Sequence, residues 1–153
     1  MIHTQKIEFA SHPKELSRIK SSFLDFCIEK EIELEGRTLK EKMGIIDRII
    51  EKCLNGKGDI VYVDNEDGFG YMICLYHDDS SGELFFGYHD SRDIPISRVS
   101  FLNFLQTIKQ KSGISLFWYP YCKRKNNERY TLYTTKILGF KENKEKKRFE
   151  FIL

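Results

Sequence analysis

A strand–helix–strand unit in the second half of the chain constrains the fold more than any other feature of the sequence. Residues 83–88 (ELFFGY) are apolar and aromatic, residues 95–111 place apolar side chains at helical spacing, and residues 114–119 (ISLFWY) are again strongly apolar. Two strands joined through a helix run parallel in one sheet, with a right-handed crossover. We therefore expect residues 83–88 and 114–119 to form adjacent, parallel strands.

Patterns on either side of this unit predict the other elements. They are a strand at 6–10, helices at 13–30 and 38–54, a hairpin of strands 59–63 and 69–76, a helix at 126–138 that ends at Gly139, a last strand at 147–153 and one further strand around Phe140. The main order is β-α-α-β-β-β-α-β-α-β. The fold class is therefore α/β of the mixed (α+β) kind, a single domain over residues 1–153. We expect a central mixed, mostly antiparallel sheet with helices on both faces.

Composition and charge argue against several functional classes. The chain has 153 residues and a formal net charge of only +2, whereas nucleic-acid-binding domains usually carry a strong basic surplus. No signal peptide and no stretch long enough to span a membrane is visible, which predicts a cytoplasmic protein. Its cysteines form no CxxC pair and its histidines have no metal-ligand spacing with them, so reduced thiols and no metal site are expected.

The turn RDIPIS, residues 92–97, has two interpretations. It follows a predicted strand and opens a predicted helix, and the N–H groups of a helix N-terminus suit a phosphate. However, the turn contains no glycine, and Pro95 removes one N–H donor. Proline is also common at helix starts that bind nothing. The turn is therefore either a phosphate site or only a helix start.

The order of elements, together with RDIPIS and the later stretch Lys136-Ile137-Leu138-Gly139-Phe140, resembles the GNAT superfamily of acyl-CoA-dependent N-acyltransferases. The resemblance covers nearly the whole chain, as that of a divergent member. RDIPIS is similar to the family's pyrophosphate loop in a degenerate form, with Pro95 at the first glycine. The resemblance implies acetyl-CoA as the cofactor, held by residues of the strand and the loop: Phe85, Phe86, Gly87, Tyr88, Arg92, Ile96, Ser97 and Arg98.

Two departures from the family pattern bear on activity. Pro95 has no N–H, so one hydrogen bond to the pyrophosphate is missing. This costs about 1.5–3 kcal/mol and weakens coenzyme A binding without abolishing it. The family's general acid is often a tyrosine four residues before the glycine, and here that position is Thr135, a far weaker acid. Tyr133 and Tyr130 are the nearby candidates that would replace it.

The remaining chemistry needs a base for the amine. The resemblance implies Glu83, at the start of the strand along the pantetheine arm; His77, Asp78 and Asp79 end the neighbouring strand. The family tends to bind substrate between its first two helices. Here that loop carries four acidic residues, Glu29, Glu31, Glu33 and Glu35. They would attract a cationic amine substrate, or they simply form an acidic loop exposed to solvent.

The leading prediction is an N-acyltransferase that transfers acetyl from acetyl-CoA to a small-molecule or peptide amine, as a monomer or homodimer. An alternative is a non-catalytic GNAT-like binding or regulatory module with weakened coenzyme A binding, which Pro95 and Thr135 favour. A third is a nucleic-acid-associated protein that uses residues 123–129 and the aromatic residues before them, and the near-neutral charge makes nucleic acid an unlikely partner.

Overall fold

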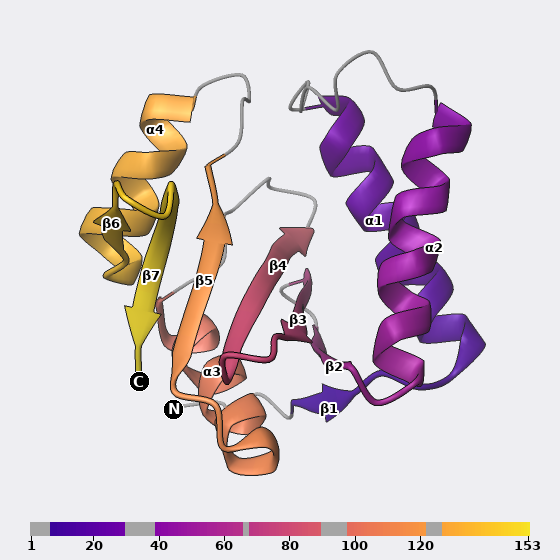
Figure 1. The fold of residues 1–153 in the computed structure, drawn as a ribbon. Coiled ribbons are helices and arrows are strands. Elements are labelled where there is room, and N and C mark those ends of the chain that lie inside the picture. Colours follow the sequence, from indigo (N-terminus) through magenta and orange to yellow (C-terminus); the bar gives the residue numbers. More distant parts are fainter. Residues whose placement is uncertain (1–6, 30–38, 66–67, 90–97, 122–126) are drawn as a thin grey trace.

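The structure, a computed structural model, describes residues 7–29, 39–65, 68–89, 98–121 and 127–153 (Figure 1). In chain order the elements are β1 (Glu8–Phe9), α1 (Pro13–Glu29), α2 (Leu39–Leu54), β2 (Gly58–Asn65), β3 (Gly68–Tyr76), β4 (Ser81–His89), α3 (Arg98–Ser112), β5 (Leu116–Pro120), α4 (Asn127–Leu132), the π-helix η1 (Tyr133–Leu138), β6 (Lys141–Asn143) and β7 (Arg148–Ile152). The predicted order is confirmed, including the additional strand near Phe140.

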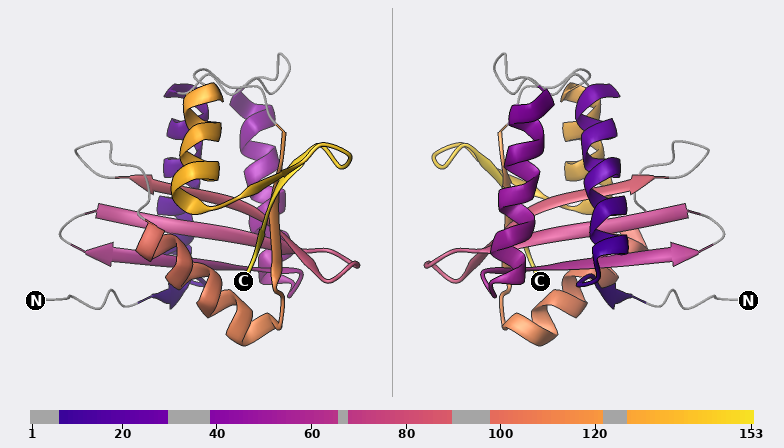
Figure 2. Two further views of the ribbon diagram at one scale, coloured as in Figure 1. Left: turned by 90° about the vertical axis from the view of Figure 1, so that its left-hand side faces the viewer. Right: turned by 90° about the vertical axis from the view of Figure 1, so that its right-hand side faces the viewer.

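All described strands belong to one sheet, in the order β1-β2-β3-β4-β5-β7-β6. Among these described strands, only β4 and β5 pair in parallel, and the other neighbours are antiparallel. The strand–helix–strand prediction is therefore confirmed. Figure 2 shows that β5 runs steeply across the direction of β2 to β4, so the sheet twists strongly where its two halves join.

Helices cover both faces of the sheet (Figure 1). On one face, Leu16 and Ile19 of α1 and Ile46 and Ile49 of α2 pack on alternate residues of β2 and β3. The other face carries α3 and η1, and its core includes four α3 side chains that are wholly buried: Phe101, Phe104, Leu105 and Ile108. Across the described residues, no helix is long and apolar enough to cross a membrane.

Several element boundaries differ from the sequence-based expectation. β1 is shorter than the predicted strand at 6–10, and β5 starts at Leu116 rather than at Ile114. The helix predicted to end before Gly139 changes from α to π at Tyr133, and Gly139 closes it with a φ of 95°, in the left-handed region that glycine tolerates best. Residues 95–97 and Thr38, the expected helix starts, lie outside the described residues.

Two glycines of β4 lie in its ladders. Gly87 pairs with Tyr71 in an unbroken β3–β4 register. Gly82 lies where neighbouring strands pack closely on β4. A Cβ at Gly82 would lie 2.5 Å from Cys74 Sγ and 3.2 Å from the Phe117 ring. Glycine at this position therefore leaves room for Cys74 of β3 and Phe117 of β5 to pack against β4 at the start of the β4–β5 ladder.

Candidate functional site

The parallel ladder between β4 and β5 is short. It contains three pairs, Ser81 with Leu116, Gly82 with Phe117 and Glu83 with Trp118, and in the described chain no pair follows. β4 nevertheless continues to His89 and β5 to Pro120, and the strands diverge (Figure 1). We call the end of the ladder at Glu83 and Trp118 the fork. Beyond it, the backbone groups of β4 that face β5 have no strand partner among the described residues.

Glu83 places a carboxylate at the fork. Its neighbour Leu84 points into the core under α3, so the alternation of side chains in a strand directs Glu83 to the face that carries α1 and α2. The Glu83 side chain is 18% exposed, and its Oε1 lies 3.0 Å from Nε2 of His77, which is 42% exposed. The predicted base is therefore a mostly buried carboxylate with a histidine partner.

Trp118, the cross-strand partner of Glu83, is held on several sides. Its indole Nε1–H donates to Ser81 Oγ at 2.9 Å, and Ser81 in turn donates to Asp79 Oδ1 at 2.5 Å. The hydrogen bond from Ser81 lowers the pKa of Asp79 below its ordinary value. The His77 ring lies 5.1 Å from the indole, and the Arg148 guanidinium lies 4.6 Å from its centroid. These contacts fix one wall of the fork.

Arg148 extends this network onto β7. Its side chain is only 9% exposed, and its Nε donates to Glu150 Oε2 at 2.8 Å. Burial alone would raise the pKa of Glu150, but hydrogen bonds from Arg148 and Asn143 outweigh it, so that pKa is lowered. Among the described residues, the buried Arg148 Nη2 has no hydrogen-bond partner.

The candidate general acids lie in and beside η1. The Thr135 hydroxyl donates to the Thr131 carbonyl at 2.7 Å, so its proton is used within the helix. Tyr133 is half-buried and packs on the core under α3, and burial raises the pKa of its phenol. Tyr130 packs edge-on against Tyr119, at 5.9 Å between ring centroids. Tyr133 is therefore a phenol that stays protonated, whereas Thr135 is engaged with the backbone.

The other predicted site residues are only partly placed. Phe85 packs edge-on against Phe23 of α1, with ring centroids 6.5 Å apart, and Arg98 is exposed at the start of α3. The backbone of 86–88 belongs to β4 and pairs with β3. The remaining predictions fall outside the described residues: Glu31, Glu33, Glu35, Arg92, Ile96 and Ser97.

Sequence reasoning missed Ser81, Trp118 and Arg148 as parts of this site. Trp118 was visible as an aromatic residue of the predicted strand, and Arg148 only as part of a basic stretch. The signal was present in the two-residue alternation that directs 116, 118 and 120 to one face of the strand. Using it required the register that pairs Trp118 with Glu83 and Glu150, and no local pattern specifies that register.

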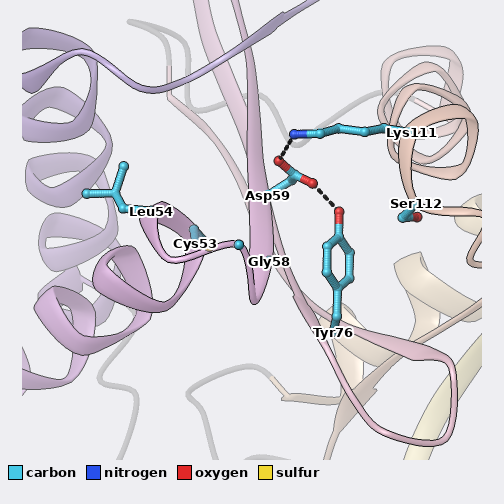
Figure 3. A pocket seen from close by; sticks show the side chains of 8 residues that line it. Cys53, Leu54, Gly58, Asp59, Tyr76, Lys111 and Ser112 are labelled. Atoms are coloured by element: carbon cyan, nitrogen blue, oxygen red, sulfur yellow. Dashed lines mark hydrogen bonds and ion pairs between the residues drawn. The ribbon is translucent and has the colours of Figure 1, made fainter.

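A cavity of about 360 Å³ lies at the C-terminal end of α3, beside Lys111 and Ser112 (Figure 3). Its central side chain is Asp59, which accepts a hydrogen bond from Lys111 at 2.6 Å and a second from the Tyr76 hydroxyl. Cys53 lies beside it, and burial followed by the charge of Asp59 raises the pKa of its thiol to about 12. The Lys111, Asp59 and Tyr76 side chains of this cavity are thus already paired with one another.

Comparison with known proteins identifies the fold. No protein-family model matches the sequence, and no curated protein is significantly similar to it. An acetyltransferase of the GNAT family from Staphylococcus aureus Mu50 superposes with a TM-score of 0.67 at 15% identity, over 96% of this chain and 98% of that one. A ribosomal-protein-alanine N-acetyltransferase from Brucella melitensis gives 0.61 at 13% identity, over 97% and 99%.

A third structure was solved with a ligand. It is yncA from Salmonella typhimurium with its cofactor acetyl-CoA, which superposes with a TM-score of 0.57 at 12% identity, over 90% of this chain and 80% of that one. At such identities the similarity is one of backbone architecture. The fold that the resemblance implies is thereby confirmed, and the chain has the GNAT fold over nearly its whole length.

Proposed function

We propose that the protein is an N-acetyltransferase that transfers the acetyl group of acetyl-CoA to an amine. The observation that supports this most strongly is the fork: the only parallel ladder among the described strands ends after three pairs, and its last pair carries the carboxylate of Glu83. The fold shared with the two acetyltransferases above, and with yncA and its cofactor acetyl-CoA, is consistent with the same activity.

The fork has groups that fit coenzyme A. The N–H and C=O groups of β4 beyond Glu83 that face β5 pair with no described strand, and they suit the amide-bearing pantetheine arm, in the way that a sheet edge takes up an extended peptide. The N-terminal end of α3 suits the pyrophosphate, with Arg98 exposed beside it. Arg92, Ile96 and Ser97 would complete this contact, and Phe85, Phe86, Gly87 and Tyr88 the contact along the strand. When bound, acetyl-CoA supplies a thioester whose carbonyl carbon an amine can attack.

Glu83 would act as the general base. An ammonium group must lose a proton before its nitrogen can attack, and a carboxylate next to the reacting centre accepts that proton. The Glu83 side chain is mostly buried and contacts His77, which keeps it in place for this step. Its position at the last pair of the ladder puts it where the two strands begin to diverge.

Tyr133 is the better candidate for the acid that protonates the departing thiolate. Its phenol stays protonated at neutral pH because burial raises its pKa. Thr135, at the family's usual position, has its hydroxyl bonded to the Thr131 carbonyl. Since a thiolate is a tolerable leaving group at neutral pH, slow transfer is expected even without an acid.

The acceptor is proposed only as an amine, on a small molecule or a peptide. Solved structures with this fold include a protein described as modifying the N-terminal serine of ribosomal protein L7/L12 from Salmonella typhimurium. Glu31, Glu33 and Glu35 would favour a cationic acceptor. We also propose a cytoplasmic location, which fits the free thiols of Cys53 and Cys74, and a monomer or homodimer.

A regulatory role without catalysis is the second candidate. It is favoured by Pro95, which lacks an N–H at the expected phosphate loop, and by the engaged hydroxyl of Thr135. Such a protein would bind coenzyme A weakly, or not at all, and would transfer no acetyl group.

Two experiments separate these functions. Acetyl-CoA should raise the melting temperature of the wild type, because it binds only the folded chain, and Pro95→Gly should increase that shift while Arg92→Ala reduces it. Thiol release should then appear with at least one of a panel of polyamines, amino sugars and peptide amines. Binding without transfer to any amine would favour the regulatory role, and absence of binding by both the wild type and Pro95→Gly would contradict coenzyme A use.

A further inference from the structure

We propose that His77 is a positioning residue for Glu83, holding the carboxylate at the fork in the orientation that accepts the proton of the amine. This inference rests on the proposed function and adds a residue to it. It is carried by a direct contact, by the attachment of His77 to the other residue of the fork, and by the rigidity of the turn on which His77 lies.

The direct contact engages one oxygen of the carboxylate. Glu83 Oε1 lies 3.0 Å from His77 Nε2, a normal hydrogen-bond distance. An ionised carboxylate has no proton to donate, so Nε2 carries the proton and donates it. Oε1 is thereby fixed, and Oε2 is the oxygen assigned to the amine. A glutamate has three rotatable bonds, and a bond of this kind selects one arrangement of them.

His77 also contacts Trp118, which faces Glu83 across the ladder. The centroids of the imidazole and indole rings lie 5.1 Å apart, and the ring planes make an angle of 48°. The indole is itself fixed by its bond to Ser81 Oγ and by the guanidinium of Arg148. His77 therefore touches both side chains of the last pair of the ladder and links them at the point where the strands diverge.

The backbone of His77 is held by a tight turn. Its N–H donates to the Ser81 carbonyl at 2.9 Å, and its carbonyl accepts from the Ser80 N–H at 3.1 Å. Ser80 has a φ of 64°, in the left-handed region, and Asp79 accepts hydrogen bonds from both the N–H and the hydroxyl of Ser81. A histidine on a turn with this many internal bonds has little freedom to move away from Glu83.

The test compares two substitutions at position 77. His77→Ala removes the donor, and we expect kcat to fall about 10- to 100-fold with the KM for acetyl-CoA changed less than about threefold, because the loss concerns orientation and not cofactor binding. The amide nitrogen of Gln occupies the place of Nε2, four bonds from Cα. His77→Gln should therefore retain kcat within about threefold of the wild type.

His12→Gln is the matched control, because His12 is exposed at the start of α1 and lies outside the site.

A spectroscopic measurement adds a signature that does not depend on turnover. The ¹⁵N signal of His77 Nε2 should change in Glu83→Gln, since a neutral amide replaces the charged acceptor, and it should not change in His12→Gln.

The outcomes distinguish this inference from the function on which it rests. A wild type that transfers no acetyl group to any amine overturns the proposed function, and the positioning role with it. A wild type that transfers normally overturns only the positioning role if His77→Ala keeps its kcat, if His77→Gln is as impaired as His77→Ala, or if the Nε2 signal is the same in Glu83→Gln.

Discussion

The two halves of the sheet are built differently. In the half from β1 to β4, the β2–β3 and β3–β4 ladders each contain eight pairs. In the other half, β5 and β7 share five pairs and β6 and β7 share three. Among the described residues, three pairs join the halves, between β4 and β5. Of the ladders in the interior of the sheet this one is the shortest, and the candidate base lies at its end, at the fork.

Side-chain burial replaces the missing pairing between the halves. The core under α3 includes Val61 and Met72 from the first half and Tyr119 and Phe149 from the second. Phe104 and its neighbours on α3 are fully buried beneath both. Because burial of an aromatic side chain contributes a few kcal/mol, α3 can hold the halves together while the strands separate above it. The backbone at the fork is thus freed without loss of the fold.

The largest effect is expected from the carboxylate at the fork. Glu83→Gln keeps the shape of the side chain but removes the base, and we expect kcat for acetyl transfer to fall about 10²- to 10⁴-fold. Steady-state thiol release measures this change. Asp47→Asn, which alters a carboxylate of α2 paired with Lys20, is the control and should leave transfer unchanged. A Glu83→Gln enzyme as fast as the wild type would place the base elsewhere.

A smaller effect on the rate of acetyl transfer is expected at η1, from the candidate acids Tyr133 and Thr135. Tyr133→Phe removes the phenol and should lower kcat about 10- to 100-fold if Tyr133 protonates the thiolate. Thr135→Val removes a hydroxyl that already donates to the Thr131 carbonyl, so transfer should stay within about twofold. Parallel thiol-release assays decide between them, and a loss in Thr135→Val alone would restore the acid role to Thr135.

The junction of the halves should be sensitive in stability rather than in rate. Gly82→Ala inserts a Cβ 2.5 Å from Cys74 Sγ, and we expect the free energy of unfolding to fall by about 1–3 kcal/mol. Gly44→Ala is the matched control, because nothing lies within 4 Å of a Cβ there, and it should stabilise α2 by about 0.5–1 kcal/mol. Denaturant unfolding measures both. Equal changes would mean that Cys74 of β3 and Phe117 of β5 are not closely packed on Gly82.

The smallest effect on transfer is expected at the far end of α3. Asp59→Asn weakens the contacts with Lys111 and Tyr76 and should cost about 1 kcal/mol of stability. Thiol release should be unchanged, because Asp59 is bonded to Lys111 and Tyr76, which have no role in the proposed reaction. A transfer rate that fell as steeply as in Glu83→Gln would show that the cavity around Asp59 takes part in the reaction.

The fold was largely predictable from the sequence, and the candidate site was not. The apolar runs at 83–88 and 114–119 and the helical spacing between them identified the parallel pair, because local periodicity specifies elements and a crossover specifies their direction. The length of the ladder, three pairs, depends on the twist of the sheet, and that is set by packing across both faces. The contact of Glu83 with His77 depends on the turn between them, whose hydrogen bonds no periodic pattern reveals.

The most direct test of the fork is to map coenzyme A binding by NMR. Acetyl-CoA and, separately, free coenzyme A are titrated into the ¹⁵N-labelled protein, and the backbone amide signals are followed. The account predicts that signals from Leu84 to His89 and from the first turn of α3 at Arg98 shift with saturation, while those of Asp59 and Tyr76 do not. Saturable shifts confined to the Asp59 cavity, or no shifts with either ligand, would contradict the assignment of the fork as the acyl-donor site.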